Sequence, residues 1–186
     1  NIGFNKPFIF RSAFGFDLLF DLFKKDSSFL QLNAQIGMQY ILSASQTGKL
    51  FVQWQSTSLL EGGIDTNAIR LEKKLPPNID VSATNVGLSY EWNNTNYRFN
   101  PRYGNEISIN TSVGIKTISR NNDVLSIKDP AFNYASLYDS IKLKSYQWRA
   151  KVAAAHYFRA GKSNTFKLGF NGGYYNSPAI FRNELF

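Results

Sequence analysis

The strongest constraint on the fold is an alternation of apolar and polar side chains with a period of two residues. Over residues 8–23 the even positions carry mainly Phe and Leu, whereas the odd positions include Arg11, Asp17 and Asp21. A β-strand places residues of one parity on one face, but a helix would scatter these rings around its circumference. The sequence therefore predicts a strand with one apolar and one polar face.

The same alternation recurs along the chain and predicts an all-β fold, an antiparallel meander of about seven long strands. At roughly 10–15 residues each, these strands exceed the length typical of globular sheets and match tilted transmembrane strands. Two segments break the alternation with Gly, Pro and mixed charges, and we expect loops at residues 61–84 and 119–144. No helix is predicted, and residues 1–186 form a single domain.

The two predicted faces differ in a way that is typical of a transmembrane β-barrel. One face carries Phe, Leu, Ile and Val, as a lipid-facing surface requires, and the other carries Gln, Asn and charged side chains, as a wet lumen requires. The residues expected to face lipid are Phe14, Phe16, Leu32, Ile36, Val52, Ile109, Val152 and Leu168. The residues expected to face the lumen are Arg11, Asp17, Asp21, Gln35, Gln53, Glu91, Arg149, Lys151, Lys167 and Asn171.

Composition argues against an enzyme. The chain has no Cys and a single His, His156, so neither a thiolate nucleophile nor a cysteine- or histidine-rich metal site is expected. Asp17 and Asp21 share a face but lie roughly 13 Å apart along a strand, too far for a carboxylate dyad. We therefore expect no catalytic residue, cofactor or metal.

The net charge of +8 raises the question of nucleic-acid binding. Proteins that bind single strands interleave cations and aromatic rings on one surface, whereas here most strand cations and most rings lie on opposite faces. We expect no nucleic-acid partner. Loop cations such as Lys73, Arg120 and Lys142 that face an anionic membrane surface, or lumen charges that tune a polar interior, fit the barrel interpretation better.

One segment resembles a known family. Residues 97–104 read YRFNPRYG and precede an alternating run, and this resembles a turn between central barrel strands of the BamA/TamA-type bacterial surface antigen family. The turn motif comprises Asn100, Pro101, Arg102 and Gly104. Residues 5–8 resemble a periplasmic turn of that family, and residues 177–186 resemble the approach to its large extracellular loop. A terminal Phe186 also suits a last barrel strand, but Pro178 favours the loop.

The resemblance implies that this domain is part of a sixteen-stranded barrel in the outer membrane of a Gram-negative bacterium, because seven strands cannot close alone. It also implies a function, the barrel segment of an outer-membrane protein assembly, insertion or translocation factor. The implied partners are outer-membrane lipid, lipopolysaccharide, nascent outer-membrane proteins and accessory periplasmic lipoproteins. Two alternatives remain open: a passive outer-membrane pore or transporter barrel, and, ranked third, a soluble β-rich binding module.

Overall fold

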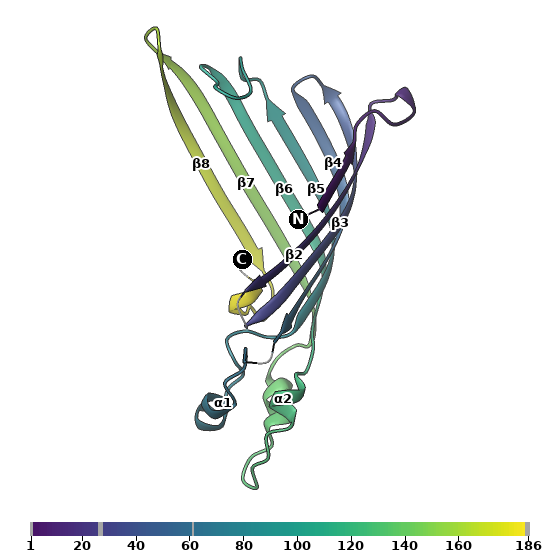
Figure 1. The fold of residues 1–186 in the computed structure, drawn as a ribbon, viewed down its shortest axis with the longest axis vertical. Coiled ribbons are helices and arrows are strands. Elements are labelled where there is room, and N and C mark those ends of the chain that lie inside the picture. Colours follow the sequence, from purple (N-terminus) through teal and green to yellow (C-terminus); the bar gives the residue numbers. More distant parts are fainter. Residues whose placement is uncertain (1, 26–27, 61, 185–186) are drawn as a thin grey trace.

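The computed structural model describes residues 2–25, 28–60 and 62–184, which form one antiparallel sheet of eight strands in sequence order (Figure 1). The strands are β1 (Ile2–Lys6), β2 (Phe14–Lys25), β3 (Phe29–Ser43), β4 (Gln46–Leu59), β5 (Val81–Asn93), β6 (Gly104–Ile118), β7 (Lys144–Ala160) and β8 (Asn164–Asn176). The helices are α1 (Thr66–Glu72), α2 (Asn122–Leu125) and the 3₁₀ turns η1 (Ile9–Arg11), η2 (Tyr134–Ser140) and η3 (Arg182–Glu184). The predicted all-β antiparallel meander is confirmed.

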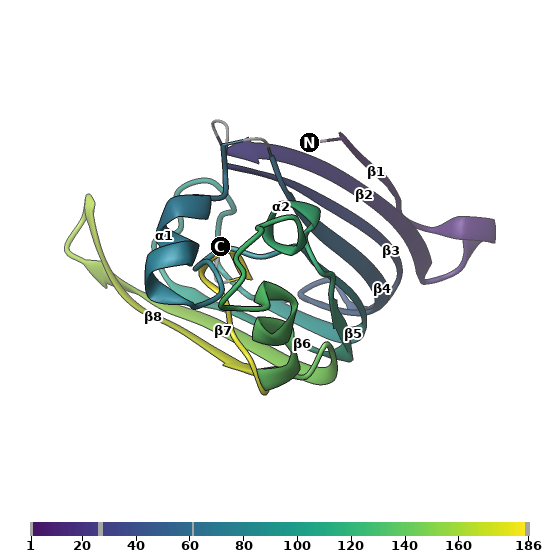
Figure 2. The same cartoon turned by 90° about the horizontal axis from the view of Figure 1, so that it is seen from below.

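The sheet is curved into a trough that stays open between β1 and β8 (Figures 1 and 2). One end, which we call the short-turn end, holds the connections at residues 7–13, 44–45, 94–103 and 161–163. The opposite long-loop end holds the β4–β5 and β6–β7 connections and the segment after β8. Helices α1 and α2 and the C-terminal segment lie across the hollow of the trough at this second end (Figure 2).

The first predicted strand is wrong in its boundaries, and the strand count is eight rather than seven. Pro7 has no N–H for a sheet ladder, and both Phe8 and Arg11 adopt a left-handed backbone with φ near 59°. The chain therefore turns at residues 7–13 and pairs β1 with β2. Arg11 lies exposed on η1, so its prediction as a lumen-facing strand residue is also wrong.

The predicted loops contain helices and end earlier than expected. Asp65 caps α1, its carboxylate accepting from the N–H groups of Asn67 and Ala68 at 3.0 Å each. Asn121 caps α2 in the same way, accepting from the N–H of Asp123 at 2.8 Å. Residues 81–84 belong to β5, and residue 144 begins β7. No helix among the described residues is long and apolar enough to cross a membrane.

The polarity of the two faces inverts near the long-loop end. Along most of the sheet the convex face is apolar, but here the concave side chains of Phe29, Val81 and Ile118 are buried, with exposed fractions of 2%, 8% and 3%. The convex positions beside the last two, Ser82 and Thr117, are polar. Val81 and Ile118 join a core formed with the loops, which also contains Ile69, Ile79, Val124, Ile127, Tyr134 and Tyr138. This end of the sheet therefore packs like a water-soluble protein.

Glycines on the concave face allow large side chains to lie flat across the sheet. Gly87 is paired with Phe51, whose ring is 3% exposed. A Cβ at Gly87 would overlap that ring and lie 2.6 Å from the Thr111 carbonyl oxygen. Gly114 leaves the same kind of space for Asn85. The missing side chains let the concave layer pack tightly across β4, β5 and β6.

We expect Gly87→Val to destabilise the protein by about 1–3 kcal/mol, because the added side chain overpacks the Phe51 ring. Urea unfolding of the intact protein measures this change. Gly48→Val is the matched control, since the nearest atom to a Cβ there would be Leu42 Cδ1 at an ordinary 3.7 Å. A loss as large for Gly48→Val as for Gly87→Val would contradict the packing argument.

Candidate functional site

The convex face carries a belt of exposed apolar side chains. Directly paired residues of an antiparallel sheet share a face. The strand pairing therefore places all eight residues expected to face lipid on the convex face. One row runs from Phe14 through Tyr40, Gly48, Tyr90 and Ile109 to Val152. The exposed fractions of Ile36, Val52 and Leu168 are 47%, 43% and 61%. An apolar surface this extensive requires a partner that shields it from water.

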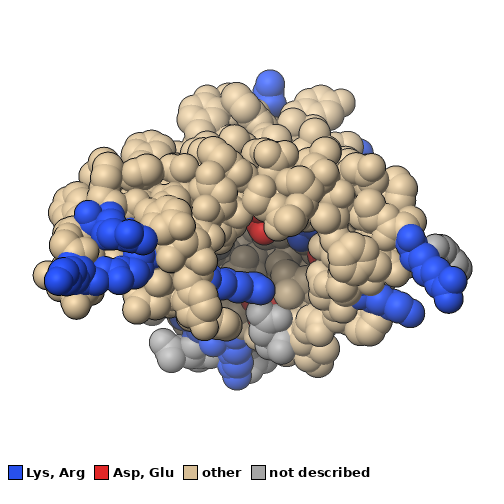
Figure 3. Space-filling model, turned by 90° about the horizontal axis from the view of Figure 1, so that it is seen from above, with Lys and Arg blue, Asp and Glu red and all other residues tan. Residues whose placement is uncertain are grey.

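The concave face is polar and charged. Nine of the ten residues expected to face a lumen lie on it, and the exception is Arg11 on η1. The nine are Asp17, Asp21, Gln35, Gln53, Glu91, Arg149, Lys151, Lys167 and Asn171. Viewed from the short-turn end, acidic and basic side chains lie inside the hollow, whereas the visible wall around it is mostly uncharged (Figure 3).

Polar side chains bridge the concave face from strand to strand. The Arg149 guanidinium on β7 donates to Gln55 Oε1 on β4 at 2.7 Å, and it lies 4.7 Å from the centre of the Tyr175 ring. The Gln147 amide donates to Asn85 Oδ1 at 2.5 Å and accepts from the Tyr175 hydroxyl at 3.0 Å. The long-loop half of the trough therefore contains a hydrogen-bonded layer that connects β4, β5, β7 and β8.

A buried ion pair joins the sheet to the chain that follows β8. Lys116 Nζ on β6 lies 2.8 Å from Glu184 Oε1, and the two side chains are 0% and 2% exposed. Lys116 also donates to the Ala179 carbonyl, and Glu184 Oε2 accepts from the Phe181 N–H at 2.9 Å. These contacts hold residues 179–184, which we call the C-terminal latch, inside the concave face.

The C-terminal latch is fixed at a second point. The fully buried Asn183 side chain accepts from the Ile79 N–H at 3.3 Å and donates to the Ile79 carbonyl at 2.7 Å. The Arg182 N–H also donates to the Pro77 carbonyl at 2.9 Å. The segment expected to approach an extracellular loop therefore folds back into the trough as far as residue 184; residues 185–186 lie outside the described residues.

The two long loops and the C-terminal latch together form a cap over the long-loop end. Asp80 connects the two loops, accepting from the Leu59 N–H at 2.6 Å and from the Asn121 amide at 2.5 Å. Tyr138 lies in the cap core, where its hydroxyl accepts from the Asn121 N–H at 3.0 Å. Burial raises the pKa of Tyr138 above its usual value, so the hydroxyl stays neutral at physiological pH.

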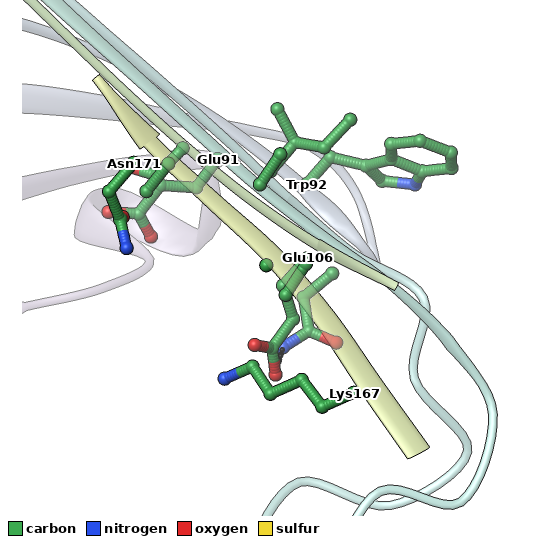
Figure 4. Close-up of a pocket in the computed structure, with 12 residues that line it drawn as sticks. Glu91, Trp92, Glu106, Lys167 and Asn171 are labelled. Atoms are coloured by element: carbon green, nitrogen blue, oxygen red, sulfur yellow. Dashed lines mark hydrogen bonds between the residues drawn. The ribbon is translucent and has the colours of Figure 1, made fainter. Parts of the chain in front are cut away.

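The short-turn end of the trough is more open. A hollow of about 290 Å³ lies there between β5 and β8, floored by Ala153, Ala155 and Gly169. Glu91, Glu106, Lys167 and Asn171 point to this side of the sheet, and Trp92 points to the other (Figure 4). Glu106 accepts from the Tyr157 hydroxyl at 3.0 Å. The small floor and charged walls make this a water-accessible recess rather than a packed core.

The turn motif links two hairpins of the short-turn end. Asn96 Oδ1 accepts from the N–H groups of Arg102 and Tyr103 at 2.7 and 3.1 Å, which closes the β5–β6 turn. The Arg102 guanidinium donates to the carbonyls of Gly161 and Lys162 in the β7–β8 turn. Gly104 begins β6 with φ 118°, and Asn100 and Pro101 lie at the turn. The Arg102 side chain therefore connects the β5–β6 turn to the β7–β8 turn.

Sequence reasoning did not single out the residues that hold the cap. Lys116 continues the polar parity of β6, so its concave position is readable from the alternation, but nothing local marks Asn183 or Glu184 as buried. Within the described ranges, no group of three or more His, Cys, Asp or Glu side chains could hold a metal ion. The candidate functional site therefore consists of the apolar convex face, the polar concave face and the cap over the long-loop end.

Comparison with known proteins does not assign this surface to a family. No family model, no curated protein and no solved structure matches the chain. Its function has to be argued from the fold and the surface chemistry.

Proposed function

We propose that this chain forms part of the wall of a transmembrane β-barrel in the outer membrane of a Gram-negative bacterium. The single observation that carries the proposal is the separation of the faces, with an exposed apolar belt outside and charged side chains in the hollow. In water the belt would be an extreme exposure of large apolar side chains, but in lipid it is solvated. The soluble binding module is disfavoured for the same reason.

The open edges support a longer barrel. Among the described strands, β8 presents thirteen residues with one edge that no strand pairs, and β1 presents five. Backbone groups in hydrocarbon must be paired, so further strands of the same protein would complete the ladder on both sides. A barrel of sixteen strands, as the family resemblance implies, provides them.

We infer that the barrel belongs to an assembly, insertion or translocation factor for outer-membrane proteins, as the turn motif suggests. The runner-up, a passive pore, requires an open lumen, and the cap with its C-terminal latch fills one end of this trough. In this proposal the open edge of a partly unzipped barrel templates incoming strands. Nascent outer-membrane proteins are then the substrates. Lipid, lipopolysaccharide at the long-loop end and accessory periplasmic lipoproteins are the remaining proposed partners.

Reconstitution of the intact protein into lipid vesicles tests this function. We expect the vesicles to accelerate the folding of an added, urea-denatured outer-membrane protein, measured by the gel shift between folded and heat-denatured forms. The control is a set of vesicles without the protein. High ion conductance with no acceleration would favour the passive pore instead.

A further inference from the structure

The positive charge of the chain is unevenly distributed. The β4–β5 connection at residues 60–80 contains three Lys or Arg and four Asp or Glu, and residues 119–143 contain three of each. Two of the cations there are engaged within the cap: Arg120 lies 3.6 Å from Asp139, and Lys73 lies 5.0 Å from the Phe132 ring centre. The long loops therefore contribute nothing to the charge of +8.

The turns of the short-turn end carry basic residues and no acidic ones. Residues 2–16, 94–105 and 157–166 contain no Asp or Glu. They carry six cations, which we call the cationic rim: Lys6, Arg11, Arg98, Arg102, Arg159 and Lys162. Viewed from this end, basic side chains are visible at several places along the outer edge and in the hollow, whereas acidic ones are visible only in the hollow (Figure 3). Arg11, Arg98 and Lys162 are exposed and form no ion pair with any described residue.

Exposed aromatic rings accompany these cations on each of the three longer stretches. Phe8 is 59% exposed beside Arg11, and Phe99 is 85% exposed beside Arg98. Phe166 follows Lys162 and is 60% exposed. The rings lie where the convex apolar belt ends. Aromatic rings with Lys or Arg at the edge of an apolar belt are the side chains that proteins place at the headgroup level of a bilayer.

We infer that the cationic rim binds the headgroups of anionic phospholipids, such as phosphatidylglycerol, in the membrane leaflet at the short-turn end. This inference rests on the proposed membrane placement and adds a lipid class and a leaflet to it. The excess of positive charge that would attract an anionic headgroup lies at the short-turn end. The long-loop end of the barrel wall has no comparable excess. The alternative is that an acidic protein binds the cationic rim.

The test measures lipid selectivity of the intact protein in phosphatidylcholine vesicles. Spin-labelled phosphatidylglycerol and spin-labelled phosphatidylcholine are compared by the fraction of each label immobilised at the protein. The rim variant combines Arg11→Gln, Arg98→Gln and Lys162→Gln, none of which has a side-chain bond to lose. The matched control combines Arg70→Gln, Lys128→Gln and Lys142→Gln at the long-loop end and removes the same charge from exposed positions.

We expect the unmodified protein and the control to prefer phosphatidylglycerol and the rim variant to lose that preference, by up to about fivefold per cation removed. Added salt should weaken the preference of the unmodified protein, since exposed charges are screened. A rim variant that keeps the preference, or a control that loses it equally, overturns the inference and leaves the cations to an acidic protein partner. Failure of the protein to float with the phosphatidylcholine vesicles would instead contradict the membrane placement itself.

Discussion

Replacing Lys116 with methionine lowers the free energy of unfolding by about 3–5 kcal/mol, because it leaves the Glu184 carboxylate buried without its counter-charge. Both members of this pair are almost fully shielded from water. The same variant frees the Ala179 carbonyl, so the C-terminal latch detaches from β6. Urea unfolding of the intact protein in lipid vesicles measures the loss.

The double variant Lys116→Met/Glu184→Met recovers most of this stability, since two apolar side chains of similar size replace a buried ion pair at little net cost. Arg120→Met is the control. Its partner Asp139 lies 3.6 Å away, but the two side chains are 47% and 69% exposed, so the expected loss is about 0.2–1 kcal/mol. Equal losses for Lys116→Met and Arg120→Met, or no recovery in the double variant, would contradict a buried latch.

Arginine substitutions at two adjacent residues of β3 test which face contacts lipid. Ile36→Arg places a cation on the convex belt, and we expect it to cost about 2–4 kcal/mol if the position lies near the bilayer midplane. Gln35→Arg places the same cation on the concave face, where water solvates it, and the expected cost is small. Folding yield and urea unfolding in lipid vesicles measure both variants.

Ile36→Arg and Gln35→Arg change adjacent residues of one strand and add the same charge. They therefore differ only in the face of the sheet that carries the new arginine. Ile36 pairs with Val52 on β4, and Gln35 pairs with Gln53. Equal damage from both substitutions, or greater damage from Gln35→Arg, would indicate that the concave face is a dry core and would remove the basis for a barrel.

The alternation predicted the faces well because one physical cause acts along each strand. Every strand residue expected to face lipid lies on the convex face. Every strand residue expected to face a lumen lies on the concave face, from Asp17 on β2 to Asn171 on β8. The period of two is a property of the extended backbone and needs no knowledge of the neighbours. Strand pairing then follows from the order of the segments in a meander.

The start of β5 was missed because the alternation changes phase there. Val81 and Ala83 are buried apolar residues of the concave face, and Val81 packs in the cap core, whereas Leu88 and Tyr90 are apolar on the convex face. If the same face is assumed to be apolar along the whole strand, the change of phase at residues 81–84 is interpreted as a loop. The polarity of a strand position depends on what covers it, and the cap is assembled from distant segments.

The C-terminal latch could not be predicted for a related reason. Glu184 follows Pro178 in a segment with weak alternation, and a lone carboxylate in such a segment usually lies in water. Its burial depends on Lys116, which is 68 residues earlier in the chain. Long-range charge pairing of this kind leaves no local signal.

The change of polarity along the strands also determines how thick a bilayer the wall can match. The apolar convex stretch covers residues 30–42 on β3, but it covers only residues 50–54 on β4 and 86–92 on β5. At about 3.3 Å per residue, the stretch on β3 is roughly twice as long as that on β5. In the proposed barrel, hydrophobic mismatch would therefore vary around the circumference, and lipid beside β4 and β5 would have to compress to cover the shorter belt.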